Sequence, residues 1–360
     1  MIIKSSENSG CIMSDHLENN RTAYLDHLRV AASFAVMMIH VVSFTWYTPD
    51  LQDLGWKTYC FFGCISRWGV PAFVMISGVL FLNRDIPIKK LYQKYILRLA
   101  AAFFAWSAFY AFTGSGTLSS KFHAFLKGPF HMWFVLMMIG LYICTPLIRK
   151  IISDKKTTVY FLAAGIIFGF IIPTCSMMIS HFGGGIINRI ASDLDSLYSN
   201  MHIYMLTGYT IYFVLGYYLN GTDLKQKQRL FFYCLGALGF AMTILLTFAV
   251  SRQENRLDEH YFDNLTLNLL LCISGIFVLF KYRNYTHAKL NRLMAKLSKF
   301  SFGAYIIHMF VLGKLKRAGL PGIFPHPIFR VMGTCIITFI ISYLISAILN
   351  QIPFVKKYLV

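Results

Sequence analysis

Long apolar runs repeat along this chain from residue 25 to residue 350, and short polar segments separate them. Most of these runs approach the roughly 20 residues that an α-helix needs to cross a bilayer, where the backbone must satisfy its own hydrogen bonds. The pattern therefore predicts an all-α integral membrane protein with about ten transmembrane helices. The predicted spans are 25–47, 58–83, 91–112, 130–149, 158–174, 204–220, 230–250, 265–280, 297–313 and 328–350.

The segments outside these runs predict one membrane domain preceded by a polar tail. Residues 1–24 contain no apolar core of the kind that a cleavable leader has, and we expect them to form a disordered cytoplasmic tail. Residues 25–360 are expected to form a single transmembrane domain. Its longest external connection runs from about residue 175 to about residue 202.

The charge of the chain is high but unevenly placed. The 34 Lys and Arg residues outnumber the 15 Asp and Glu residues, which gives a net charge of +19, although 56% of the chain is hydrophobic. With a cytoplasmic N-terminus, most Lys and Arg residues fall on cytoplasmic segments, as the positive-inside rule requires. We therefore expect both termini to be cytoplasmic, and we expect the excess charge to contact anionic lipid head groups rather than nucleic acid.

The eight cysteines are scattered, and most lie inside predicted spans. Cys60 and Cys64 are one helical turn apart, a spacing that suits packing against a neighbouring helix as well as it suits a metal. The sequence contains no CxxC pair and no His/Cys cluster with zinc spacing. We therefore assign no metal and no disulfide from the sequence.

Arg29 and His40 lie in the first predicted span. Eleven helical residues return to within about 20° of the starting direction, so both side chains are expected on one face, about 16 Å apart along the axis. Ionisable groups at such depth are costly and usually face a polar cavity. This face is the strongest candidate for a functional site.

The second predicted span carries Arg67, followed by Pro71 and Gly78. Because this span enters from the outside, Arg67 is expected at about the depth of His40. Pro71 can kink the helix, and Gly78 removes bulk, as a cavity or a close helix contact would require. Alternatively, Arg67 extends to the outer surface or only ties two helices together.

Two further spans contribute weaker candidates. His131 and Trp133 begin the fourth span near the outer interface, where placing such residues costs little free energy. Ser301, Tyr305 and His308 share one face of the ninth span. This polar stripe either holds the helix bundle together or lines a cavity.

These motifs resemble those of the membrane acyltransferase-3 family, which acylates cell-surface carbohydrates. The resemblance extends in order over nearly the whole chain from residue 25. The matching residues are Arg29 and His40, Arg67-Trp68-Gly69-Val70-Pro71, Ile76-Ser77-Gly78, His131-Met132-Trp133-Phe134, Pro146, Leu215-Gly216-Tyr217, Leu297-Ser298 and Ser301-Phe302-Gly303-Ala304-Tyr305-Ile306-Ile307-His308.

The resemblance implies a multi-pass protein of the bacterial cytoplasmic membrane. It would transfer an acyl group from cytoplasmic acyl-coenzyme A to a hydroxyl of a surface or lipid-linked glycan, with no permanently bound cofactor. Acetyl is the default acyl group and succinyl is the alternative. Membrane lipids are the other expected partners, and the oligomeric state stays open.

The resemblance also implies roles for the candidate residues. Asp26 and Arg29 would hold coenzyme A at the cytoplasmic mouth, and His40 would act either as general base or as transient acyl carrier. Arg67 would stabilise the oxyanion of the tetrahedral intermediate. Acceptor binding would involve Tyr305, His308, His131 and Trp133.

Two other functions are compatible with the same residues. A transporter or flippase of a glycan, amino acid or lipid-linked intermediate would use His40 and Arg67 as a proton-coupled site. A scaffold subunit of an envelope assembly would not depend on His40 beyond stability. An enzyme needs acyl-coenzyme A, whereas a transporter needs a gradient and no acyl donor.

Overall fold

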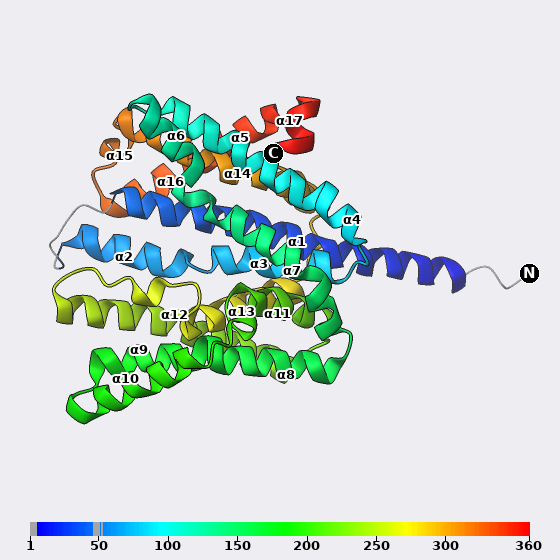
Figure 1. Cartoon of the computed structure of the whole chain (residues 1–360). Coiled ribbons are helices and arrows are strands. Elements are labelled where there is room, and N and C mark those ends of the chain that lie inside the picture. The colour runs from blue at the N-terminus through cyan, green and yellow to red at the C-terminus, as the bar shows by residue number, and fades with distance from the viewer. Residues whose placement is uncertain (1–5, 46–50, 52) are drawn as a thin grey trace, which may run out of the picture.

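The computed structural model describes residues 6–45, 51 and 53–360, and this part of the chain is helical without any strand. Figure 1 shows α1, α2 and α3 between two groups of helices, one containing α5, α14 and α16 and the other containing α8 to α13. Packing of α1 against α14, of α3 against α11 and of α2 against α12 connects these groups. Short helical segments of other types complete the fold: the π-helical segments η1 (Leu91–Ile96) and η3 (Ile167–Ile171), and the 3₁₀ helices η2 (Phe130–Met132), η4 (Tyr204–Leu206) and η5 (His260–Phe262).

The helices follow the predicted spans in order, with short additional helices between them. They are α1 (Ser6–Thr45), α2 (Leu54–Ser66), α3 (Gly69–Leu82), α4 (Ile88–Lys90), α5 (Leu97–Thr113), α6 (Leu118–Lys127), α7 (Trp133–Ile152), α8 (Lys155–Ile166), α9 (Ile172–Phe182), α10 (Gly185–Asn200), α11 (Tyr209–Gly221), α12 (Gln226–Glu254), α13 (Leu267–Tyr282), α14 (Ala288–Arg317), α15 (Leu320–Ile323), α16 (Pro327–Leu349) and α17 (Pro353–Tyr358).

The all-α membrane architecture is confirmed. Within the described residues, eight helical segments are long and apolar enough to cross a membrane. The two remaining predicted spans, 204–220 and 297–313, correspond to the 13-residue α11 and the 30-residue α14. The ten-helix count and the cytoplasmic termini stay predictions. The last two residues of the first predicted span, 46 and 47, lie outside the described residues.

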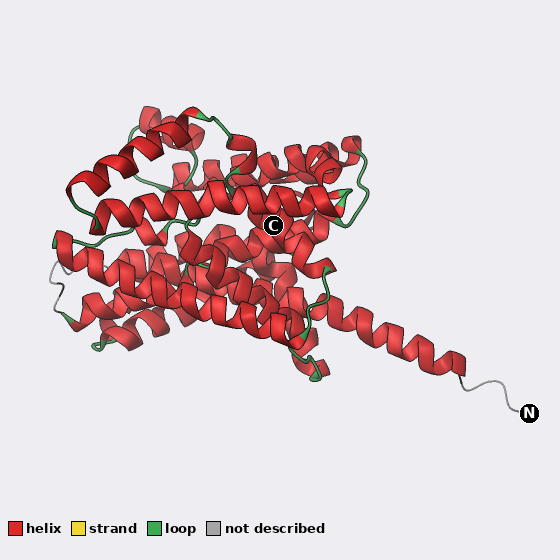
Figure 2. Ribbon diagram, turned by 90° about the horizontal axis from the view of Figure 1, so that it is seen from below, coloured by secondary structure: helices red, strands yellow, loops and turns green. Residues whose placement is uncertain are grey.

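The expectation of a disordered tail is wrong for residues 6–24. These residues continue α1, which begins at Ser6, and both views show its N-terminal part projecting from the bundle (Figures 1 and 2). Helix propagation explains the difference, because each residue added to a formed helix gains one backbone hydrogen bond. Residues 1–5 of the predicted tail lie outside the described residues.

The second predicted span is two helices rather than one. The helix is interrupted at Arg67 and Trp68, between α2 and α3. Pro71 has no backbone N–H, so the carbonyl of Arg67 cannot receive the bond that would continue the helix. The next bond, from the Ala72 amide to the Trp68 carbonyl, is intact at 3.0 Å. Arg67 therefore lies in a break between two helices, where its backbone angles are still those of a right-handed helix.

The connection predicted between about residues 175 and 202 is mostly helical. It contains the end of α9 and all of α10, and Gly183 and Gly184 interrupt the chain only between these two helices. The apolar side chains of Ile186, Ile190 and Leu197 on α10 are exposed. Helical spacing of apolar residues across an otherwise polar segment explains why the segment forms a helix rather than a loop.

Two glycines allow α3 and α11 to approach closely. A Cβ atom added at Gly78 would lie 1.8 Å from the Phe213 carbonyl oxygen, and one added at Gly216 would lie 2.3 Å from the Met75 carbonyl oxygen. Both distances are shorter than any real contact, so each helix needs a glycine where it faces the backbone of the other. This contact holds α3, one wall of the first cavity described below, against α11.

Replacing Gly78 by alanine is expected to lower the free energy of unfolding by about 1–3 kcal/mol, because the added methyl group must push two backbones apart. Thermal unfolding of the detergent-solubilised protein measures this loss. Gly140→Ala is the matched control, since a Cβ atom there meets nothing within 4 Å. Equal unfolding temperatures for the two variants would contradict the proposed close contact.

Arg149 of α7 satisfies carbonyl groups at the end of α3. Its guanidinium donates to the Phe81 oxygen at 2.8 Å, to the Ile86 oxygen at 3.1 Å and also to the Arg84 oxygen. The last carbonyls of a helix have no intrahelical partner, and a basic side chain is a suitable donor for them. Its 3.7 Å ion pair with fully exposed Asp85 contributes little by comparison.

Arg149→Met is expected to destabilise the protein by about 2 kcal/mol, because hydrogen bonds from a charged donor are lost together. Lys150→Met changes the adjacent, exposed cation and is expected to stay within about 0.5 kcal/mol of wild type. Chemical or thermal unfolding in detergent provides the comparison. A similar effect of both substitutions would show that the overall charge of this helix end matters and that the carbonyl contacts do not.

Candidate functional site

A cavity of about 340 Å³ lies among α1, α3, α5, α7 and α14. Arg29 and His40 of α1 both line it, as the helical spacing predicted. Apolar side chains such as Phe73, Leu99 and Val135 form much of its wall. The polar side chains are grouped, with cations around Arg29 and imidazoles around His40.

The cationic group consists of Arg29, Arg98 and Lys299. The Arg29 guanidinium donates to Ser298 Oγ at 3.2 Å, and Arg98 donates to the carbonyl oxygen of Val360. Arg98 and Lys299 are exposed, whereas Arg29 is half-buried. The cavity is therefore reached from the surface past two cations, and a third lies further inside.

The second group contains three imidazoles. The ring centroid of His40 lies 5.0 Å from that of His308 and 6.4 Å from that of His131, and the latter two are 5.4 Å apart. His131 and His308 are 2% and 0% exposed, whereas His40 is half-buried. Of these three, His40 is therefore the imidazole best placed to meet a ligand in the cavity.

Tyr305 and Tyr110 hold this group in place. The Tyr305 hydroxyl donates to the His131 carbonyl, and the Tyr110 hydroxyl donates to the Ile306 carbonyl at 2.7 Å. His131 Nε2 lies 3.2 Å from the same Ile306 oxygen. The sequence left open whether the polar stripe on the ninth span packs against other helices or lines a cavity. Tyr305 does both, because it packs against Phe134 of α7 and also lines the first cavity.

His308 has one ring nitrogen engaged and one without a partner. Its Nδ1 contacts the carbonyl oxygen of Tyr305, which assigns the proton to Nδ1. Its buried Nε2 has no hydrogen-bond partner among the described residues. His308 therefore offers an acceptor atom beside the His40 ring.

Arg67 lines a different cavity, of about 850 Å³, together with Asp258, His260 and Phe262. Its guanidinium lies 4.2 Å from the centre of the Phe262 ring, and its buried Nε has no hydrogen-bond partner among the described residues. The sequence predicted that Arg67 and His40 would lie at one level. They nevertheless line separate cavities, His40 the first and Arg67 the second.

Of the remaining sequence candidates, one lines the first cavity and one lies close in the sequence to a residue that does. Trp133 lines the first cavity, and its ring lies 5.7 Å from that of Tyr209. Asp26 does not line it, but lies one helical turn before Arg29 on α1. The sequence interpretation missed Arg98 and Lys299 as cavity residues. Nothing in their local sequence distinguishes them from the other cations at span ends.

This arrangement suits a ligand with an anionic end and a reactive end. Guanidinium and ammonium groups bind phosphate, and a neutral imidazole can accept the proton of a hydroxyl. Separately, His181, Asp258 and His260 form a group of three potential metal ligands near the second cavity.

The Acyltransferase domain family (Acyl_transf_3) matches residues 22–347, a range that includes the imidazole group, Arg29, Arg98, Lys299 and Arg67. No curated protein and no solved structure matches the chain. Because the family match covers most of the sequence and the helices have membrane-spanning length, this chain belongs to the acyltransferase-3 family and is a multi-pass membrane acyltransferase.

Proposed function

We propose that this protein is an O-acyltransferase of the bacterial cytoplasmic membrane. It takes an acyl group, acetyl by preference over succinyl, from cytoplasmic acyl-coenzyme A and transfers it to a hydroxyl of a surface or lipid-linked glycan. The observation that carries the proposal is the first cavity, which places three cations and an accessible imidazole in one enclosure. The membrane domain also resembles the O-acetyltransferase of enterobacterial common antigen, which makes such a glycan the first acceptor to test.

The cationic group would bind the donor. Arg98 and Lys299 at the mouth would meet the phosphates of coenzyme A, since charge-assisted bonds to phosphate are among the stronger ones. Arg29 would hold the following part of the donor, and Asp26 would offset its charge from one turn away. The axial rise from Arg29 to His40, about 16 Å, lets an extended thioester arm reach the imidazole.

His40 would be the general base for the acceptor. The glycan hydroxyl oxygen attacks the thioester carbonyl carbon while His40 takes the hydroxyl proton. The tetrahedral intermediate then collapses, the carbon–sulfur bond breaks, and the imidazolium returns the proton to the departing thiolate. The products are an O-acyl ester and free coenzyme A. The alternative with His40 as transient acyl carrier uses the same residue as nucleophile.

The neighbouring side chains would orient His40. His308 Nε2, which has no partner in the described part of the chain, lies beside the His40 ring and could accept a hydrogen bond from it, which would direct the other His40 nitrogen to the acceptor hydroxyl. Tyr305 ties His131 to α14, and Trp133 forms part of the wall against which a sugar ring would pack. In this proposal His308 is a positioning residue.

Arg67 would act on the acceptor side. We expected it to stabilise the oxyanion, but it lines the second cavity with Phe262, whereas His40 lines the first. The second cavity has a guanidinium, carboxylates and amide groups in its wall, as a hydroxyl-rich glycan requires. We therefore propose that Arg67 contacts the glycan as it enters the second cavity.

His40→Ala is expected to abolish transfer of radiolabelled acetyl from acetyl-coenzyme A into envelope carbohydrate, because the hydroxyl loses its base. A general base contributes about 10²–10⁴-fold to rate, so the residual activity should fall by at least 100-fold. Membranes containing wild-type protein or the variant at matched expression are compared. His123→Ala on exposed α6 is the control and should retain wild-type transfer.

Equal labelling by wild type and His40→Ala would remove His40 from the chemistry. If neither protein transfers label and acyl-coenzyme A does not protect the purified protein against thermal unfolding, the acyltransferase proposal fails. The transporter alternative would then be favoured. Gel filtration of each variant shows whether a loss of activity reflects misfolding.

Lys299→Met is expected to raise the KM for acetyl-coenzyme A about fivefold with little change in kcat, because an exposed ion pair contributes up to about 1 kcal/mol to binding. Lys296→Met is the matched control, since Lys296 is exposed on the same helix and does not line the cavity. Steady-state rates over a range of donor concentrations separate the two parameters. An equal rise in KM for both variants would contradict a donor site at Lys299.

A further inference from the structure

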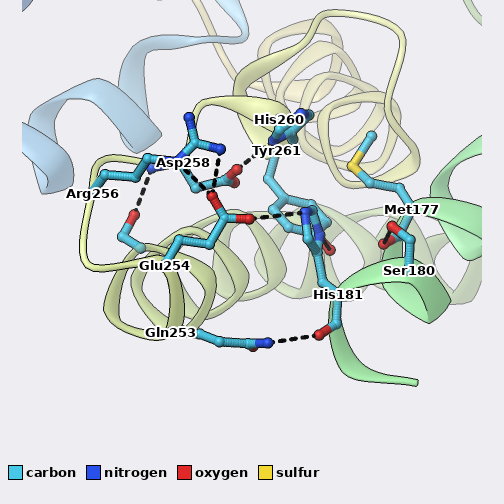
Figure 3. A network of polar contacts seen from close by, with 10 residues as sticks. Met177, Ser180, His181, Gln253, Glu254, Arg256, Asp258, His260 and Tyr261 are labelled. Atoms are coloured by element: carbon cyan, nitrogen blue, oxygen red, sulfur yellow. Dashed lines mark hydrogen bonds and ion pairs between the residues drawn. The ribbon is translucent and has the colours of Figure 1, made fainter. Parts of the chain in front are cut away.

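Three side chains that are distant in sequence meet near the second cavity. His181 ends α9, and Asp258 and His260 lie 77 and 79 residues later, around the start of η5. Each offers one nitrogen or oxygen atom, and these three atoms all lie within 4.8 Å of one another. Figure 3 shows the carboxylate and the two rings gathered above the end of α12.

Asp258 is the member that most requires a cation. Its side chain is 0% exposed, and its Oδ1 contacts His260 Nδ1. Its Oδ2 is buried and has no hydrogen-bond partner among the described residues. A buried carboxylate oxygen without a partner is costly, and such groups are normally paired or coordinate a metal.

The surroundings fix the position of the His181 ring. The Tyr261 hydroxyl lies 3.2 Å from His181 Nδ1, which orients that ring and leaves its Nε2 3.8 Å from Glu254 Oε1 (Figure 3). Gln253 donates to the His181 carbonyl at 3.0 Å. Metal-binding histidines commonly have their second nitrogen held in this way by another protein group.

The charged groups around the cluster are mixed. Arg256 is 70% exposed and pairs with Glu254 Oε2 at 2.7 Å, so the second Glu254 oxygen faces His181. Glu259 and Asp263 lie on the same segment and line the second cavity with Arg67. The carboxylates outnumber the guanidinium groups here, which favours a cation.

We propose that His181, Asp258 and His260 bind one divalent transition-metal ion of the zinc class. Two imidazoles and a carboxylate form the mixed nitrogen and oxygen donor set that Zn²⁺ accepts, whereas Mg²⁺ and Ca²⁺ prefer oxygen ligands alone. Zn²⁺ bonds of about 2.0–2.2 Å require the side chains to adjust, because the contact between Asp258 Oδ1 and His260 Nδ1 must open and the wider separations must close. Glu254 is the nearest candidate for a fourth ligand.

The ion would connect two segments that are distant in the sequence. It would tie the end of α9 to the segment that carries Phe262, and Phe262 in turn packs over Arg67 and beside buried Trp56 and Cys64. Metal binding would thus stabilise one wall of the second cavity. This role is independent of acyl transfer, and its test needs no activity.

The test measures Zn²⁺ binding by the purified full chain after removal of metals with a chelator. Wild type should bind about one Zn²⁺ per chain in competition with a chromophoric chelator, unfold several degrees higher with Zn²⁺, and bind no Mg²⁺ under the same conditions. Asp258→Asn and His181→Gln should weaken Zn²⁺ binding by about 100-fold or more, since even partners of ligands contribute 10- to 100-fold. His202→Gln, an exposed histidine outside the cluster, should bind as wild type does.

His260→Gln keeps the test decisive if the variants at buried positions fail to fold. The His260 side chain is 55% exposed, so its substitution is expected to leave the fold intact. It too should lose Zn²⁺ binding while eluting as a monodisperse protein. Absence of Zn²⁺ binding by wild type overturns the proposal, as does binding by His260→Gln equal to that of wild type. Either result would mean that Asp258 and His260 form only an ion pair.

Discussion

Burial of charge in a low-dielectric bundle is the constraint on which the rest of this structure depends. A guanidinium or imidazole among apolar helices must have a polar enclosure or a specific partner, since the membrane offers no water in its place. Arg29 and His40 meet this condition in one cavity, and Arg67 meets it in another. The apolar side chains of the bundle are arranged around these enclosures.

Two local features of the backbone shape the helices around these cavities. Gly78 and Gly216 let α3 and α11 touch, so α3 presents the opposite side to the first cavity without a space behind it. Pro71 ends the hydrogen-bond ladder below Arg67 and so separates α2 from α3.

In the proposed reaction, the two cavities would have different roles. The first has cations at an exposed mouth and an imidazole inside, which suits a phosphate-bearing thioester donor. The second is larger and contains both carboxylates and Arg67, which suits a hydroxyl-rich acceptor. The proposed metal site would stabilise the wall of the second cavity through Phe262, and the donor cavity would be unaffected.

The local pattern of the sequence determined most of the long apolar helices, the shared face of Arg29 and His40, and the family, because helical period and motif order are properties of nearby residues. Gly216 and Arg149 had no evident role until their partners on other helices were known. Only the tertiary structure decided that His131 and His308 lie beside His40, and that Arg67 does not share its cavity. It also brought His181 to Asp258 and His260. Contacts between distant helices depend on how whole faces pack, and no local spacing encodes that.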